Sequence, residues 1–372
     1  MARMIRRALS LLFLAAAVGA AQTAKPSPWV MQNSGTTASL RGIHALPGGI
    51  AWASGTDGTV LRTEDGGYLW QKCAVPHDAE KQDFRSIWAW DAQRALAVSS
   101  GPAYNSRIYK TSDGCKTWKR TLYNPDPNGF WDGIVFITEH NAFLLGDPLD
   151  GRWDMKFTQD AGDTWFGAGD PGLEADAKTE GAFAASNSSL AAMGPNFWFG
   201  SGGTGGAFLH YSTKECAGQP KGAECPLAWH KVAVPMAGGT AGAGVFSVSA
   251  REYLPTDFHP KGQTELKLHV VAVGGDYEKP NESKGTAAYS TDGGVTWTAA
   301  AVPPHGYRSA VAWDKADRAW IAVGTNGSDY SRDDGKTWQP LDDGEWNALS
   351  LPYVVGPKGR IAKLADNAIP RK

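Results

Sequence analysis

The sequence predicts an all-β fold made of repeated units of about four strands. An eight-residue phrase that turns on an aspartate and ends in tryptophan occurs five times in the chain. The 372 residues also include 45 glycines, 22 prolines and 16 tryptophans. Short apolar runs separated by such turn formers indicate many short strands rather than helices. Because a catalytic motif is normally needed once, a recurring phrase indicates architecture.

The chain begins with a segment that is typical of a secretory signal. Arg3, Arg6 and Arg7 supply a positive region, residues 8–18 an apolar run, and small residues follow. The apolar run is shorter than the roughly 20 residues that a membrane-spanning helix needs. We therefore expect residues 1–24 to be a signal peptide and residues 25–372 to be one domain. The mature protein is expected in the periplasm or outside the cell, without stable membrane insertion.

Export makes the four cysteines candidate disulfides. Cys216 and Cys225 bracket a short polar loop and are predicted to pair, which leaves Cys73 and Cys115 for each other. A metal site is the competing interpretation, but no histidine stands beside either pair at zinc-ligand spacing. We expect two disulfides, no metal and no cofactor.

The repeated phrase fits a hairpin turn. Its copies occupy residues 63–70, 111–118, 158–165, 290–297 and 331–338. Successive aspartates are 48, 47 and 41 residues apart where copies follow one another directly. Aspartate accepts backbone N–H groups in the turn, glycine adopts positive φ, and the tryptophan packs against a neighbouring unit. This period corresponds to the four-stranded blade of a propeller.

These phrases resemble the Asp-box, or BNR repeat, whose pattern is S/T-x-D-x-G-x-T-W. The resemblance spans nearly the whole mature chain. In that family the box forms the turn between the third and fourth strands of a blade, on the face away from the usual binding site. The resemblance implies that five aspartates have a structural role in turns: Asp65, Asp113, Asp160, Asp292 and Asp333.

Seven short apolar runs are predicted to be the innermost strands of the blades. They cover residues 40–46, 84–90, 131–137, 181–186, 244–250, 307–313 and 346–351. The last run has no box of its own, but residues 353–365 supply two further strands and residues 28–35 an outer one. The prediction is a single seven-bladed β-propeller, closed by pairing of the N- and C-terminal strands so that no edge stays open.

Binding is predicted at the rim opposite the boxes, because several loops on that rim are long. Aligning the innermost strands places eight residues near the mouth of a central funnel: Arg41, Arg85, Trp131, Asp132, Glu180, Tyr307, Arg308 and Asn347. Three arginines and two carboxylates could hold a carboxylate or a sugar. In the alternative interpretation they pair with one another and plug the channel.

Several classes of function are disfavoured. A formal net charge of −2 argues against a strongly basic nucleic-acid binder. No G-x-S-x-G or H-E-x-x-H motif is present. Sialidases also contain Asp-boxes, but their first arginine lies in an F/Y-R-I-P motif, whereas the nearest strings here are LRGI, FRSI and YRSA. Sialidases are also six-bladed.

The chain more closely resembles exported, single-propeller proteins related to the photosystem II stability and assembly factor. That resemblance implies a non-catalytic scaffold that binds a protein partner through its loop-rich face, and we expect a monomer. The alternative is a glycan-binding or glycoside-hydrolase propeller. It would need Glu180 or Asp132 at reactive distance from a nucleophile, with Tyr307 in that role for a sialidase.

Overall fold

The computed structural model describes residues 27–215, 225–253 and 267–370. Within these ranges the chain forms strands and two short 3-10 helices, η1 (Pro47–Gly49) and η2 (Ala103–Asn105). No helix in the described ranges is long and apolar enough to cross a bilayer. The all-β prediction is confirmed. The predicted signal peptide, residues 1–24, lies outside the described residues.

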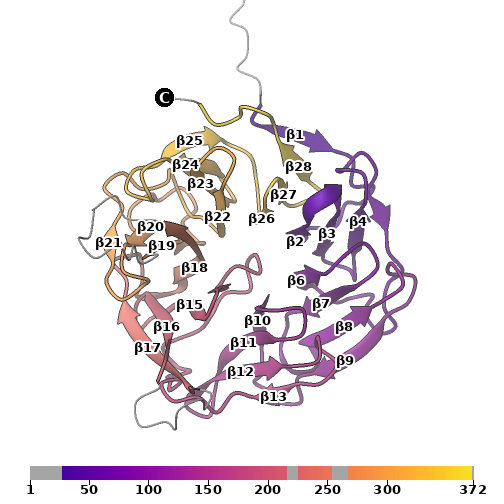
Figure 1. Ribbon diagram of the computed structural model, residues 1–372, viewed down its shortest axis with the longest axis horizontal. Coiled ribbons are helices and arrows are strands. Elements are labelled where there is room, and N and C mark those ends of the chain that lie inside the picture. Colours follow the sequence, from indigo (N-terminus) through magenta and orange to yellow (C-terminus); the bar gives the residue numbers. More distant parts are fainter. Residues whose placement is uncertain (1–26, 216–224, 254–266, 371–372) are drawn as a thin grey trace, which may run out of the picture.

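The strands form antiparallel sheets that surround a central axis (Figure 1). Five sheets have four strands each. A sixth sheet has eight strands, in two four-stranded halves that join through the pairs Gly202–Gly244 and Gly203–Thr240. In all but the last unit, the chain runs from the axis outward (Figure 1).

The strands of each unit follow one another along the sequence. The first two units contain β2 (Leu40–Ala45), β3 (Ala51–Gly55), β4 (Val60–Thr63) and β5 (Gln71–Lys72), then β6 (Phe84–Ala89), β7 (Ala95–Ser99), β8 (Arg107–Thr111) and β9 (Lys119–Tyr123). The next two contain β10 (Trp131–Phe136), β11 (Ala142–Leu149), β12 (Arg152–Thr158) and β13 (Phe166–Gly167), then β14 (Leu190–Met193), β15 (Asn196–Gly203), β16 (Phe208–Lys214) and β17 (Leu227–Ala233). They are followed by β18 (Thr240–Tyr253), β19 (Lys267–Asp276), β20 (Ala287–Ser290) and β21 (Thr298–Ala299), then β22 (Ala310–Asp314), β23 (Ala319–Gly324), β24 (Gly327–Ser331) and β25 (Gln339–Asp342).

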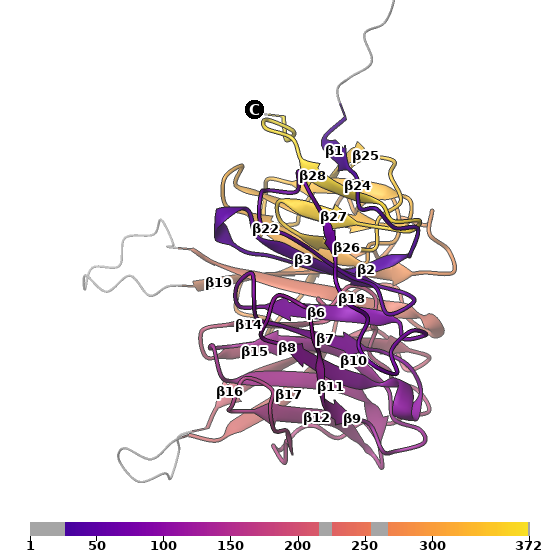
Figure 2. The ribbon, with the colours of Figure 1, turned by 90° about the vertical axis from the view of Figure 1, so that its right-hand side faces the viewer.

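The last unit takes its outer strand from the beginning of the described chain. It contains β26 (Ala348–Ser350), β27 (Tyr353–Val355), β28 (Ile361–Leu364) and β1 (Trp29–Gln32). β1 lies beside β28 in both ribbon views (Figures 1 and 2) and pairs with it along its whole length. The Trp29 side chain is 2% exposed and packs on Trp346 with ring centroids 6.0 Å apart. The two ends of the described chain are thereby joined in one sheet.

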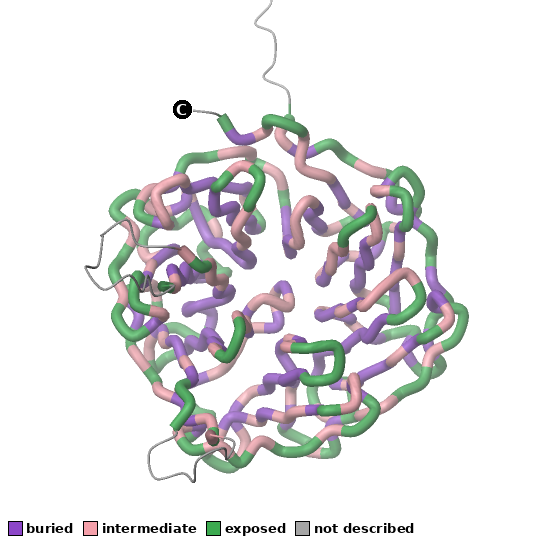
Figure 3. The backbone as a smooth tube through the Cα atoms, in the orientation of Figure 1, coloured by how far each residue is buried: buried purple, intermediate pink, exposed green. Residues whose placement is uncertain are grey.

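The hydrophobic core is divided into layers between neighbouring sheets. For example, Leu40 and Ile43 of β2 pack in one cluster with Tyr353 and Ile361 of the last sheet. Figure 3 shows the buried segments along the strands and the exposed segments at the outer strands and turns. Each sheet therefore buries apolar side chains on both faces, which a single isolated sheet could not do.

One innermost strand differs from the prediction. Residues 181–186 are predicted to form it, but the strand at this place is β14, which begins at Leu190, four residues after the predicted strand ends. Phe183 instead stacks on Phe246 with ring centroids 3.7 Å apart, and Gly181 forms an isolated bridge with Gly202. Contacts with residues distant in the sequence outweigh local strand preference in this segment.

The five repeated phrases form turns between the third and fourth strands of their units, and we call them the repeated turns. In the second of them, Thr111 Oγ1 donates to Asp113 Oδ1 (2.9 Å), which also accepts the backbone N–H of Thr117 (3.0 Å). The Thr117 hydroxyl donates to Asp113 Oδ2 (2.6 Å) and lowers the pKa of Asp113 to about 2. The equivalent hydroxyls of three other turns make the same contact: Thr164, Thr296 and Thr337. The predicted turn aspartates thus accept hydrogen bonds from their own turns.

The first repeated turn lacks this hydroxyl, because Leu69 stands at the position of the threonine. Leu69 is 59% exposed. Leu69→Thr should supply the missing hydrogen bond to Asp65 and raise Tm by about 1 °C. Leu69→Val has the shape of threonine without the hydroxyl and is the control. Scanning calorimetry of the two variants measures the difference, and equal Tm values would contradict the prediction.

A disulfide joins the first two units, with the Cα atoms of Cys73 and Cys115 5.3 Å apart. Cys115 lies in the second repeated turn at a position that the other turns give to glycine. Its φ of 63° is in the left-handed region that favours glycine. The predicted Cys216–Cys225 disulfide stays a prediction, because residue 216 lies outside the described residues.

Candidate functional site

β-Bulges interrupt four innermost strands at equivalent positions. The strand register shifts between residues 40 and 42 of β2, 84 and 86 of β6, 131 and 133 of β10, and 245 and 247 of β18. The residues that the shifts leave unpaired are Arg41, Arg85, Asp132 and Phe246. An extra residue in one strand re-aims its side chain. All four side chains line one cavity.

This cavity, which we call the axial cavity, has a volume of about 540 Å³ and lies where the innermost strands begin and the second strands end. Its polar lining includes Arg41, Arg85, Asp132, Asp147, Ser309 and Asn347. Its aromatic lining consists of Phe130, Phe183, Phe246, Tyr277 and Tyr307. Asp147 is also at a bulge, because the register of β11 with β12 shifts between residues 146 and 148.

The arginines of the axial cavity are only partly neutralised. Arg85 Nε donates to Asp83 Oδ2 at 2.8 Å. Arg41 Nε is buried without a hydrogen-bond partner among the described residues. Burial and the neighbouring Arg85 charge lower the pKa of Arg41, which nevertheless stays protonated because the ordinary pKa of arginine lies far above neutral pH. The cavity therefore presents cationic N–H donors that protein groups do not saturate.

Burial raises the pKa values of two carboxyl groups in the axial cavity. Burial raises the pKa of Asp147 to about 6, although Asp147 Oδ1 accepts the backbone N–H of Ala182 at 2.8 Å. Burial, followed by repulsion from Asp147, raises the pKa of Asp132 well above its usual value. Asp132 Oδ2 has no hydrogen-bond partner among the described residues. A protonated Asp132 can donate to a ligand oxygen, as the arginines do.

Aromatic side chains form the other wall of the axial cavity. Phe246 stacks on Phe183 and meets Tyr307 edge-on, with ring centroids 4.8 Å apart. Tyr277 extends this wall outward and is 51% exposed. Burial raises the pKa of the Tyr307 phenol. Its phenol therefore remains protonated, whereas a nucleophilic tyrosine needs an activated hydroxyl.

The structure brings together five of the eight residues predicted for the funnel: Arg41, Arg85, Asp132, Tyr307 and Asn347. The sequence prediction missed Asp147, Phe183, Phe246 and Tyr277. Phe246 is the third residue of its predicted run, whereas Arg41, Arg85 and Asp132 are second in theirs, so an alignment by the first residue of each run missed it. Asp147 lies at the end of a second strand, which that alignment did not cover.

Two of the other three predicted residues interact with side chains outside the axial cavity. Trp131 is fully buried in the core between two sheets, and its Nε1 donates to Asp154 Oδ2 at 3.0 Å. Glu180 forms an ion pair with Lys231, whose ammonium lies 4.0 Å from the centroid of the Phe208 ring. Trp131 and Glu180 do not line the axial cavity.

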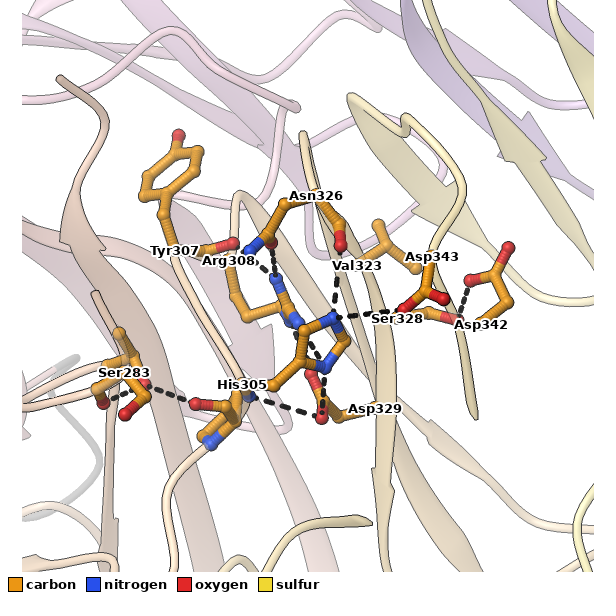
Figure 4. A network of polar contacts seen from close by, with 12 residues as sticks. Ser283, His305, Tyr307, Arg308, Val323, Asn326, Ser328, Asp329, Asp342 and Asp343 are labelled. Carbon is orange, nitrogen blue, oxygen red and sulfur yellow. Dashed lines mark hydrogen bonds and ion pairs between the residues drawn. The ribbon is translucent and has the colours of Figure 1, made fainter. Parts of the chain in front are cut away.

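Arg308, the third, does not line the cavity and points into a buried polar network (Figure 4). Its Nε donates to Asp329 Oδ2 (2.6 Å) and its Nη1 to Asn326 Oδ1 (2.6 Å). Its side chain has no exposed surface, and that of Asp329 is 1% exposed. Figure 4 shows the Tyr307 ring directed away from this network. The side chains of these two adjacent residues therefore point in different directions: Tyr307 lines the cavity, and Arg308 belongs to the buried network.

His305 belongs to the same network and faces oxygen acceptors with both ring nitrogens. Nδ1 lies 2.8 Å from Asp329 Oδ1, and Nε2 lies 3.0 Å from the Asn326 carbonyl oxygen and 4.0 Å from Asp343 Oδ1. The protonated ring can donate to both sides. The hydrogen bond with Asp329 raises the pKa of His305, although burial and the Arg308 charge oppose this.

The His305 network should make stability depend on pH. Because the folded state raises this pKa, the stabilisation is complete below about pH 6.5 and is lost as the pH rises through the folded-state pKa. We expect the free energy of unfolding of the wild type to fall as the pH rises from about 6.5 through the folded-state pKa, and that of His305→Gln to fall less. Burial lowers the pKa of His44 and His210 to about 4 and about 3, so both titrate below this window. Urea denaturation across the window tests this, and parallel profiles would refute it.

No group of three or more His, Cys, Asp or Glu side chains is placed to hold a metal ion in residues 27–215, 225–253 and 267–370.

Solved structures of other proteins share this fold. No protein-family model and no curated protein matches the chain. A solved structure of YCF48 bound to D1 peptide is 19% identical, with a TM-score of 0.57 over 92% of this chain and 98% of that one. YCF48 from Cyanidioschyzon merolae is 18% identical, with a TM-score of 0.56 over 92% and 100% of the two chains. The chain is therefore similar in fold to YCF48, a β-propeller and photosystem II assembly factor, as the sequence resemblance predicted.

Proposed function

We propose that the protein is a non-catalytic scaffold that binds a segment of a protein partner in the axial cavity. The observation that carries this proposal is the set of bulges that turns side chains of several innermost strands into one cavity. Bulges that re-aim side chains are common beside functional sites. The similarity in fold to YCF48 bound to D1 peptide supports a peptide as the ligand.

The two walls of the axial cavity suit a peptide segment. Arg41 and Arg85 can hold a carboxylate or backbone carbonyl groups, because guanidinium N–H groups are strong donors to such oxygens. The wall of Phe183, Phe246 and Tyr307 can contact an apolar or aromatic side chain of the same segment. Such a mixture of a few polar groups with aromatic surface is typical of specific ligand pockets.

We also propose that the fold is a seven-bladed propeller with Asp-box turns. Counting the eight-stranded sheet as two blades makes seven blades, and the repeated turns are Asp-boxes in the role that the resemblance implies. We further propose that the protein is exported, that its mature form begins near residue 25, and that it is a monomer. The Cys73–Cys115 disulfide supports export, since disulfides persist in oxidising compartments.

Site-specific photo-cross-linking tests the binding site. A benzophenone amino acid replaces Tyr277, which is half exposed at the cavity rim, in the mature protein expressed in its native host. A matched probe replaces Tyr68, which is 93% exposed in the first repeated turn. We expect a discrete protein adduct from the first probe and none from the second.

Substitution of the cavity arginines completes the test. Arg41→Gln with Arg85→Gln should reduce the yield of the adduct about tenfold, because two charge-assisted contacts are lost. Arg94→Gln with Arg120→Gln removes the same charge from exposed positions and should leave the yield unchanged. The absence of a Tyr277-specific adduct, or equal losses in both double variants, would count against partner binding in this cavity.

Glycan binding or glycoside hydrolysis is the second candidate, and one observation favours it. Asp147, with a pKa near 6, and the neighbouring Asp132 place two protonatable carboxyl groups in one cavity, and glycosidases use a carboxyl pair. A panel of glycans scored for binding and cleavage tests this candidate. Cleavage by the wild type that Asp147→Asn abolishes would establish it, and no cleavage by the wild type would exclude it for those glycans.

A further inference from the structure

A second polar cavity lies on the opposite edge of the ring of sheets from the axial cavity. It has a volume of about 570 Å³ and is lined by Arg251, Trp313, Ala316, Asp317, Arg318, Arg332 and Asp334. Arg251 lies near the end of β18 and Trp313 on β22, and the other residues come from the β22–β23 turn and the last repeated turn. Because the innermost strands begin at the axial cavity and end at this edge, we call it the turn-side cavity.

Arg251 is held rigidly in the turn-side cavity. Its Nε donates to Asp334 Oδ1 at 2.9 Å and its Nη2 to the same oxygen at 2.5 Å. The guanidinium carbon lies 4.6 Å from the centroid of the Trp313 ring. Nη1 takes no part in these contacts. A stacked and paired guanidinium of this kind has little freedom left to lose on binding a ligand.

Two residues of the cavity have left-handed backbone conformations. Asp334 has φ = 61°, at a position of the repeated turn where three other copies have glycine: Gly66, Gly114 and Gly293. Arg318 has φ = 51° in the β22–β23 turn. Side chains other than glycine, asparagine and aspartate are disfavoured in this region, and such conformations cluster at binding sites. Asp334 is thus placed at a position suited to glycine, and its carboxylate holds Arg251.

The two remaining arginines carry charge that no described carboxylate neutralises. Arg332 donates from Nη1 to the Asp317 carbonyl oxygen (2.6 Å) and from Nη2 to the Ile369 carbonyl oxygen (3.4 Å), and its buried Nε has no described partner. The exposed Arg318 side chain takes part in no hydrogen bond or ion pair of the described residues. The three arginines outweigh the two carboxylates, Asp317 and Asp334, by one positive charge.

We propose that the turn-side cavity binds a tetrahedral oxyanion, a phosphate or sulfate group that is either free or part of an ester. Three guanidinium groups from three chain segments offer donors to several oxygens of one anion, whereas one guanidinium fork satisfies a planar carboxylate. The site shares no residue with the axial cavity and does not depend on partner binding there. We expect a dissociation constant on the order of 1 mM.

Titration of the mature protein with inorganic phosphate or sulfate at constant ionic strength tests the site, with chloride as the reference. Isothermal calorimetry gives the affinity, and the shift in Tm gives an independent value. Arg318→Gln should weaken binding about tenfold, since it removes a charged donor without disturbing any described contact of the fold. Arg120→Gln removes an exposed arginine that lines neither cavity, and it should bind as the wild type does.

Vesicles identify the source of the anion. Binding of free phosphate or sulfate that Arg318→Gln weakens, without binding to phosphatidylglycerol vesicles, supports a soluble ion or ester. Binding of both, weakened by the same variant, supports a lipid phosphate as the source. A wild type that shows no saturable effect of phosphate or sulfate up to about 20 mM, or equal affinities of Arg318→Gln and Arg120→Gln, would overturn the proposal.

Discussion

Arg308→Ala should lower the free energy of unfolding by about 3–5 kcal/mol. The substitution leaves the carboxylate of Asp329, which is 1% exposed, without its arginine partner. Removing one member of a buried ion pair leaves an uncompensated charge in a medium of low polarity, and this costs more than the pair itself contributes. Urea denaturation near neutral pH measures the change.

Two variants make this prediction specific. Arg308→Gln combined with Asp329→Asn removes both charges and should cost less than Arg308→Ala alone. Arg94→Ala removes an arginine that contacts Asp91 at 2.7 Å and Glu139 at 2.6 Å but is 45% exposed. It should cost no more than about 1 kcal/mol, because solvent screens exposed pairs. If Arg308→Ala and Arg94→Ala had equal effects, the network would not stabilise the fold as argued.

Trp29→Ala should also lower the free energy of unfolding by about 3–5 kcal/mol. Trp29 lies on β1, which supplies the outer strand of the last sheet, and its Nε1 donates to Ser328 Oγ at 3.1 Å. Its ring packs in a cluster with residues of the preceding sheet, among them Ile321 and Val323. Truncation leaves a cavity between two sheets at the point where the ring of sheets closes.

A residue on the same strand provides the control for Trp29. Met31→Ala removes a side chain that is 53% exposed and should change the free energy of unfolding by less than about 0.5 kcal/mol. Chemical denaturation compares the two variants, and limited proteolysis reports opening of the ring. A loss below about 1 kcal/mol for Trp29→Ala would show that β1 contributes little to closure.

Both proposed sites are formed by residues that interrupt the regular backbone of strands and turns. Bulged residues supply the axial cavity, and left-handed residues other than glycine hold the turn-side cavity. The strands between the two edges carry the apolar core. Substitutions at either edge can therefore change binding with little effect on the sheets, and this makes the matched arginine variants informative.

The sequence by itself determined the all-β class, the repeated four-stranded units and the turn role of the five aspartates. The turn role rests on contacts within eight consecutive residues, such as the hydrogen bonds of Thr111 and Thr117 to Asp113, so a local pattern reveals it. It also placed Arg41, Arg85 and Asp132 together, because equivalent positions of repeated units meet at one axis.

Only the tertiary structure decided what neighbouring residues do. Tyr307 and Arg308 look equally suited to a funnel, yet Arg308 turns to Asp329, 21 residues later in the chain, and Tyr307 lines the cavity. Likewise, Phe183 leaves the predicted strand to stack on Phe246. The partner of a buried charge or ring depends on the register and packing of strands that are distant in sequence. A local sequence pattern does not reveal which distant residue that partner is.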